Sequence, residues 1–195
     1  MVKMTETPMK TVFFFLLFAL LSTGGISAEV DKAALSGLCA KLGPVLWSAP
    51  DKRLVRATTY KKGKDAVDSH SRQSKSDEKI GLRYASAKET GTLAVPDWLP
   101  RGSMVKIHTE HGAFCYIAAD EGGAVDSRKA AKESGKTEEQ RAAPVLDFCA
   151  GEQLWPDFII VEIYYYAGKI PFNELSHEDQ KVLFAYAREY VSHRE

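Results

Sequence analysis

The sequence predicts a mainly β fold, a small barrel whose only helices lie near the two ends of the chain. Runs rich in β-branched and aromatic residues recur through the middle of the sequence, and turns containing glycine or proline separate them. Apolar residues at helical spacing occur only before residue 43 and after residue 176. Many short strands with terminal helices, and no internal repeat, favour an all-β barrel over an alternating α/β fold.

The first segment, 1–28, has the features of a secretory signal peptide. Lys3 and Lys10 precede an apolar run over 12–21, and small residues lead to Ala28. The apolar run is short for a bilayer span, although an uncleaved N-terminal anchor is the alternative interpretation. We therefore expect an exported protein, in the periplasm or outside the cell, with no stable membrane insertion after cleavage.

The charge balance of the chain limits the kinds of partner that we expect. The chain has 26 basic and 26 acidic residues and no formal net charge. This balance gives no indication of nucleic acid or an acidic membrane surface as a partner. The part after the signal peptide is long enough for one domain with a core but short for two.

The region 29–53 is expected to be an N-terminal leader. Within it, 32–42 carries apolar residues at the spacing of a short amphipathic helix, and Gly43-Pro44 would end that helix.

The barrel is expected over 54–168. Its predicted strands are 54–60, 80–84, 91–95, 104–108, 113–119, 144–148 and 158–166. Two segments interrupt them. The polar stretch 61–79 is either a flap beside a site or a plain surface loop. The insert 126–143, rich in lysine, glutamate, alanine and arginine, is either an exposed helix or disordered.

The final region, 169–195, is predicted to contain an amphipathic helix. Ser176 and Asp179 have the spacing of a capping box at its start. Six apolar residues then recur at helical spacing: Val182, Leu183, Tyr186, Ala187, Tyr190 and Val191. Such a stripe docks on its own barrel or, in the alternative, on a partner protein.

Three cysteines follow the signal peptide: Cys39, Cys115 and Cys149. In an oxidising compartment, a Cys115–Cys149 disulfide would join two of the predicted strands. The alternative is that all three are small buried thiols. Their spacings match no zinc or redox motif.

Two aspartates stand out as candidates for chemistry. Asp120 ends an apolar run and is followed by Gly122 and Gly123, which would let backbone approach a ligand; a tight turn with a solvated aspartate is the alternative. Asp147 lies between two apolar residues of a predicted strand, so its side chain points away from both. It faces either water or a cleft, where desolvation would raise its pKa as a general acid requires.

Other candidates are weaker. Asp97 follows Pro96 in a turn, and Trp98 is either a stacking platform for a sugar ring or a core residue. His108 and His111 have H-x-x-H spacing, but across a strand end and a turn rather than on a helix, so no metal site is expected. The sequence has no nucleophile elbow, Walker loop, dinucleotide fingerprint or H-E-x-x-H motif.

Five blocks in 58–164 resemble a known family. The blocks are Thr58-Thr59-Tyr60, Gly91-Thr92-Leu93-Ala94-Val95-Pro96-Asp97, Leu99-Pro100-Arg101-Gly102-Ser103, 118–125 and Leu146-Asp147-Phe148. Their order and content resemble the three-aspartate (3D) domain, although Pro96-Asp97 reverses the order typical of that family. These domains occur in bacterial peptidoglycan-cleaving proteins and in one family of lytic transglycosylases.

The resemblance implies a six-stranded double-psi β-barrel, to which the C-terminal α-helix and the short N-terminal helix are added. It also implies an enzyme that cuts peptidoglycan between N-acetylmuramic acid and N-acetylglucosamine. It implies Asp147 as the catalytic acid/base and Asp120 as its support. The expected substrate-binding residues are Asp97, Tyr60, Thr92, Gly122, Gly123 and Trp98. No cofactor or metal is expected, and the protein is expected to be a monomer whose partner is the glycan strand.

Two other functions stay open at this point. One is a non-catalytic barrel that binds cell-wall glycans through Trp98, Tyr60 and a surface groove. The other is an exported structural or inhibitory protein that uses its C-terminal helix to dock on a partner protein.

Overall fold

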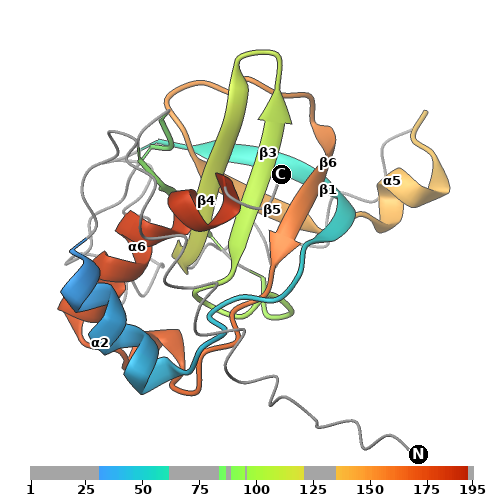
Figure 1. Cartoon of the computed structure of the whole chain (residues 1–195). Coiled ribbons are helices and arrows are strands. Elements are labelled where there is room, and N and C mark those ends of the chain that lie inside the picture. The colour runs from blue at the N-terminus through green and yellow to red at the C-terminus, as the bar shows by residue number, and fades with distance from the viewer. Residues whose placement is uncertain (1–30, 62–83, 87–88, 95, 121–134, 193–195) are drawn as a thin grey trace, which may run out of the picture.

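The fold is a closed six-stranded barrel with two helices packed against one side (Figure 1). The structure is a computed structural model, and it describes residues 31–61, 84–86, 89–94, 96–120 and 135–192. The helices are α2 (Lys32–Leu42), α5 (Glu138–Ala142) and α6 (His177–Ser192), with a 3-10 turn, η2, at Phe172–Glu174. The strands are β1 (Asp51–Tyr60), β2 (Gly91–Ala94), β3 (Met104–Thr109), β4 (Gly112–Asp120), β5 (Val145–Cys149) and β6 (Phe158–Tyr164).

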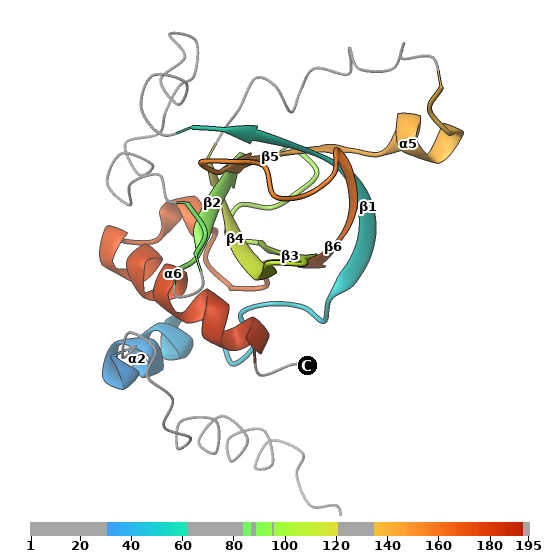
Figure 2. The same ribbon diagram turned by 90° about the horizontal axis from the view of Figure 1, so that it is seen from above.

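The strands follow the order β1-β5-β2-β4-β3-β6 around the barrel. Two neighbouring pairs, β1/β5 and β2/β4, are parallel, and the other four pairs are antiparallel. The closed ring is seen end-on in Figure 2. The mainly β class, the six-stranded barrel and the C-terminal helix are thereby confirmed.

Several boundaries differ from the expected ones. β1 begins at Asp51 rather than at residue 54, because its first half pairs with β6 from Ile163 back to Phe158. Of the expected strand 80–84, only Tyr84 is described, and it is not in a strand. The signal peptide, almost all of the loop 61–79, and 126–134 of the insert lie outside the described residues; the rest of the insert includes the short, exposed helix α5.

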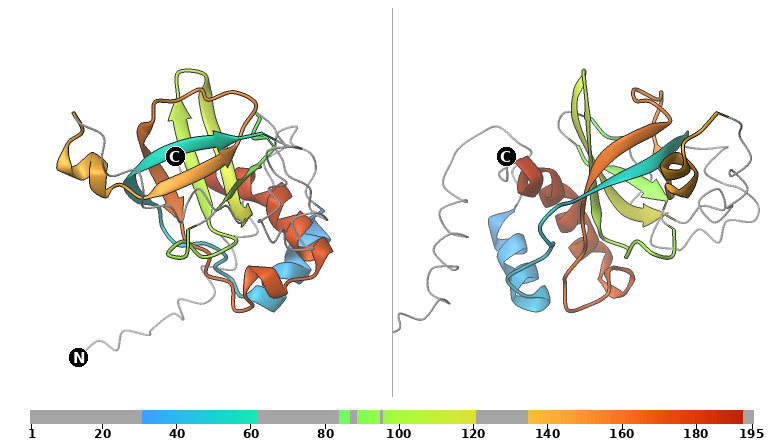
Figure 3. Two further views of the ribbon diagram at one scale, coloured as in Figure 1. Left: turned by 180° about the vertical axis from the view of Figure 1, so that it is seen from behind. Right: turned by 90° about the vertical axis from the view of Figure 1, so that its right-hand side faces the viewer.

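Apolar side chains fill the barrel interior and a second layer outside it. Inside, Tyr116, Phe148 and Trp155 meet edge to face, with ring centroids 4.9–6.1 Å apart. Outside, α2 and α6 bury their apolar stripes against the face of β4 that carries Cys115 and Ile117. Figure 3 shows both helices on one side of the barrel.

The two helices are capped and joined by polar contacts. Asp31 accepts hydrogen bonds from the amides of Ala33 and Ala34 at the start of α2. The amide of Asp179 donates to Ser176 at the start of α6, as the sequence pattern predicts. The carboxylate of Asp179 also pairs with Lys41 at 3.1 Å, which links the helices. No helix within the described ranges is long and apolar enough to cross a bilayer.

Candidate functional site: two aspartates beside Ala94

Asp120 and Asp147 lie on opposite sides of the same residue of β2. Ala94 pairs with Asp120 across the parallel β2/β4 ladder and with Asp147 across the antiparallel β2/β5 ladder. Both carboxyl groups are largely removed from solvent, with 4% of Asp120 and 8% of Asp147 exposed. Two buried acids that share one neighbour need specific partners, because burying an unpaired charge is costly.

Asp147 obtains its partner from β1. Thr58 pairs with Asp147 in the parallel β1/β5 ladder, and its hydroxyl donates to Oδ1 over 2.7 Å. Burial raises the pKa of Asp147, the Thr58 hydrogen bond lowers it, and the charge of Asp120 raises it further; the pKa ends above its usual value. Asp147 is therefore expected to keep its proton to higher pH than an ordinary aspartate does.

Asp120 obtains its partner from the end of the same strand. The hydroxyl of Tyr60 donates to Asp120 Oδ2 over 2.7 Å, a distance typical of a hydrogen bond to a carboxylate. Burial, together with the charge of Asp120 and this hydrogen bond, raises the pKa of Tyr60 far above its ordinary range. Tyr60 is thus a permanent donor, and it stabilises the ionised form of Asp120. Thr92 also contacts the Tyr60 hydroxyl.

Strand alternation explains the position of Asp147. Leu146 and Phe148 point into the barrel core, so Asp147 points out of it. Leu93 also points into the core, so the next residue, Ala94, faces the same outer side of the barrel as Asp147.

Strand alternation alone does not explain the position of Asp120. Ala118 faces the core, and a regular strand would point Asp120, two residues later, to the same side. The β2/β4 register shifts between Leu93 and Ala94: Leu93 pairs with Ala118, but Ala94 pairs with Asp120. This irregularity lets Asp120 meet Tyr60 rather than continue the inward row.

The structure brings together four of the residues expected to act on the substrate: Asp120, Asp147, Tyr60 and Thr92. It assigns Tyr60 a different immediate contact from the expected one, because its hydroxyl is engaged by Asp120. Thr58 completes the cluster but was not among the expected site residues. The threonine-x-tyrosine pattern contained the signal, since 58 and 60 must lie on one face of a strand. Gly122 and Gly123 lie outside the described residues.

Asp97 and Trp98 are placed differently. Asp97 is exposed in the turn after β2. Trp98 is half-buried against the barrel core, and the guanidinium of Arg53 lies 4.8 Å from the centre of its ring. Arg53 precedes Thr58 by five residues, about 16 Å along a strand. Trp98 therefore packs beside the first half of β1, whereas the carboxylates are held by its second half.

The expected Cys115–Cys149 disulfide is not present in this structure, in which both cysteines are buried and neither is disulfide-bonded. Their strands, β4 and β5, are separated by β2. Two strand spacings amount to about 10 Å, beyond the reach of a disulfide between Cα atoms. Burial raises the pKa of Cys115 to about 12, which makes its thiol unreactive at neutral pH.

The two histidines have separate partners. Nε2 of His108 lies 3.6 Å from Glu162, and Nε2 of His111 lies 3.4 Å from Glu110. Among the described residues, no three histidine, cysteine, aspartate or glutamate side chains converge as a metal site would require.

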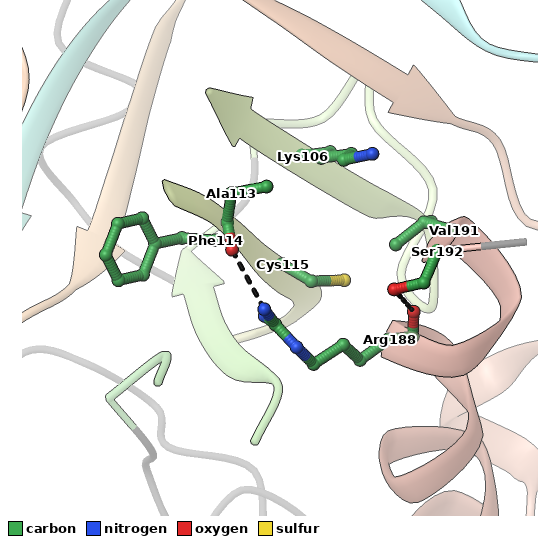
Figure 4. A pocket seen from close by; sticks show the side chains of 7 residues that line it. All are labelled: Lys106, Ala113, Phe114, Cys115, Arg188, Val191 and Ser192. Atoms are coloured by element: carbon green, nitrogen blue, oxygen red, sulfur yellow. Dashed lines mark hydrogen bonds between the residues drawn. The ribbon is translucent and has the colours of Figure 1, made fainter. Parts of the chain in front are cut away.

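A small cavity lies elsewhere, between the end of α6 and the β3/β4 hairpin (Figure 4). Its lining includes Lys106, Cys115 and Arg188, and the Arg188 guanidinium donates to the carbonyl of Ala113 over 3.0 Å. Neither aspartate contributes to its lining.

Comparison with protein-family models, with curated proteins and with solved structures finds no match to this chain. The arrangement around Ala94 must therefore be interpreted on its own chemistry.

Proposed function

We propose that this protein is an exported enzyme that cleaves the glycan strands of peptidoglycan in the manner of a lytic transglycosylase. The single observation that supports this proposal most is the pairing of Ala94 with both Asp120 and Asp147. Two buried carboxyl groups in unequal environments are the usual equipment for glycosidic bond cleavage.

The two acids have different roles in this proposal. Asp147 has a raised pKa and serves as the acid. Asp120, which accepts a hydrogen bond from Tyr60, serves as the carboxylate that stabilises positive charge developing on the sugar. Its negative charge also favours the protonated form of Asp147.

The reaction has two steps. Protonated Asp147 donates its proton to the oxygen between N-acetylmuramic acid and N-acetylglucosamine, and the bond from that oxygen to the muramic C1 breaks. The Asp147 carboxylate then removes the proton from the muramic 6-hydroxyl, while the oxygen of that hydroxyl bonds to C1. The product is a 1,6-anhydro sugar, and Asp147 is again protonated. The reaction consumes no water, and neither step requires a group beyond the two carboxyls.

We further propose that the barrel is of the double-psi type, in line with the resemblance to three-aspartate domains. The two parallel pairs, β1/β5 and β2/β4, support this assignment because each joins strands that are not consecutive in the chain. Both parallel pairs carry a site aspartate, on β5 and on β4.

The test is incubation of the purified protein with peptidoglycan sacculi, followed by mass spectrometry of the soluble products. We expect anhydromuropeptides from the wild type and none from Asp147→Asn. Asp157→Asn is the matched control, since Asp157 is an exposed aspartate outside the expected site and its replacement should leave the products unchanged. Products with reducing ends would indicate hydrolysis instead. Retention on sacculi without any product would replace the proposal with a glycan-binding function.

A further inference from the structure

We propose that Thr58 is a positioning residue that directs the acidic proton of Asp147 to Oδ2, the carboxyl oxygen that Thr58 does not contact. This inference rests on the proposed function for its catalytic meaning, because only that function needs Asp147 to deliver a proton in one direction. The hydrogen bonding itself is independent of what the protein cleaves.

The Thr58 hydroxyl lies between two oxygen acceptors. Oδ1 of Asp147 is 2.7 Å away, and the carbonyl oxygen of Leu146 is 3.4 Å away. The hydroxyl has one hydrogen and can give it to only one of them at a time. The shorter contact has the length of a strong O–H···O bond, whereas the longer one is at the limit of hydrogen bonding. Thr58 therefore donates to Asp147.

This donation makes the two oxygens of Asp147 unequal. A proton on Oδ1 that is aimed at Thr58 would place two hydrogens between the two oxygens, and the Thr58 hydroxyl would have to turn to the distant carbonyl of Leu146. A proton on Oδ1 that is aimed elsewhere would leave Thr58 with a hydroxyl oxygen as its acceptor, which is weaker than a carbonyl oxygen. A proton on Oδ2 leaves the 2.7 Å hydrogen bond intact, with Oδ1 as a carbonyl-like acceptor. The protonated acid consequently presents its O–H on the side away from β1.

The same contact also favours the first step, in which Asp147 gives up its proton. When Asp147 has lost its proton, the Thr58 hydroxyl donates to a full carboxylate, and a charge-assisted bond is about twice as strong as a neutral one. Thr58 therefore opposes burial and the Asp120 charge, both of which favour the protonated form. The position is fixed by the β1/β5 ladder, in which Thr58 and Asp147 are directly paired.

The charged and titratable groups around Asp147 come from three strands. Asp120 lies across β2 at the end of β4. Tyr60 is the next residue of β1 on the Thr58 face, and Arg56 is the preceding one, paired with Val145. Cys149 follows on the same face of β5. A test of Thr58 must leave these groups unchanged, which a substitution at position 58 alone achieves.

The experiment is a carbon-13 NMR titration of the aspartate side-chain carboxyls in the full chain. The Asp147 signal is assigned by its loss in Asp147→Asn. We expect Thr58→Val, which removes the hydroxyl at nearly constant volume, to shift the Asp147 midpoint to higher pH. Thr58→Ser keeps the hydroxyl and should keep the midpoint close to the wild-type value. Thr58→Ala provides the same loss of donor should the valine variant fail to fold.

An unchanged Asp147 midpoint in folded Thr58→Val or Thr58→Ala would overturn the inference, as would a serine variant that shifts as far as valine. The titration needs no substrate. A wild type that releases no products from sacculi would therefore refute the proposed function without affecting this result. If the wild type is active, the pH at which activity is lost on the alkaline side should move upward in Thr58→Val together with the NMR midpoint.

Discussion

The hydroxyl of Tyr60 donates to Oδ2 of Asp120 over 2.7 Å, and this bond joins the last residue of β1 to the last residue of β4. β1 and β4 are not neighbours in the barrel, because β5 and β2 lie between them. The bond therefore spans the face on which both aspartates are found. It fixes one carboxylate and keeps the two acids in different environments.

Replacing Tyr60 with phenylalanine should weaken cleavage without unfolding the protein. The change removes a hydrogen bond to a charged group, which is worth about 1.5–3 kcal/mol, or roughly 10- to 100-fold in rate if it is felt in the transition state. The measurement is the rate of anhydromuropeptide release. Tyr165→Phe is the matched control, because its hydroxyl contacts Asp51 at 3.1 Å instead. Equal losses in the two variants would contradict the role given to Tyr60.

Replacing Asp120 with asparagine should lower the pKa of Asp147. The charge of Asp120 is one of the causes that raise this pKa, and the amide keeps the shape of the side chain but not its charge. Carbon-13 titration should show the Asp147 midpoint at lower pH than in the wild type. Asp97→Asn should leave it in place. A midpoint that rises in Asp120→Asn would show that the two carboxyls do not interact as like charges.

Asp147 should make the wild type lose stability as the pH rises. A carboxyl whose pKa is higher in the folded state than its value of about 3.9 in an unfolded chain binds more protons when folded. Folding is then penalised progressively from about pH 4 upward, until the pH passes the raised folded value. Asp147→Asn lacks this titration, so its melting temperature should gain relative to the wild type across that interval. The comparison requires thermal unfolding at several pH values; a difference that is constant with pH would argue against a raised pKa.

Local pattern was sufficient for much of the barrel but only for part of the site. The side-chain alternation around Asp147 is set by two large apolar neighbours, Leu146 and Phe148, so a single strand predicts its direction. The C-terminal helix was equally readable, since its cap and its apolar stripe are local features. These elements depend on nearby residues alone.

Features that depend on strand order could not be read in this way. The possible Cys115–Cys149 disulfide depends on how close β4 and β5 lie, and β2 lies between these strands. The orientation of Asp120 depends on a register shift opposite Leu93 and Ala94, which no residue pattern in β4 announces. The contact of Trp98 with Arg53 likewise joins a turn to a strand more than forty positions away in the sequence. Long-range pairing decides each of these.

The stability of the barrel should depend strongly on Phe148. Its ring is fully buried and meets Tyr116 and Trp155 edge to face, with centroids 4.9 and 5.4 Å apart. Phe148→Ala removes these contacts and leaves a cavity, at a cost of about 3–5 kcal/mol in the free energy of unfolding. Ile160→Ala is the control, since Ile160 is 62% exposed on β6 and its truncation should cost under about 0.5 kcal/mol. Denaturant unfolding measures the free energy of unfolding of both variants. Comparable small losses in the two variants would mean that the interior aromatic cluster does not hold the barrel together. Because Phe148 is next to Asp147, its loss should also loosen the position of the Asp147 carboxyl.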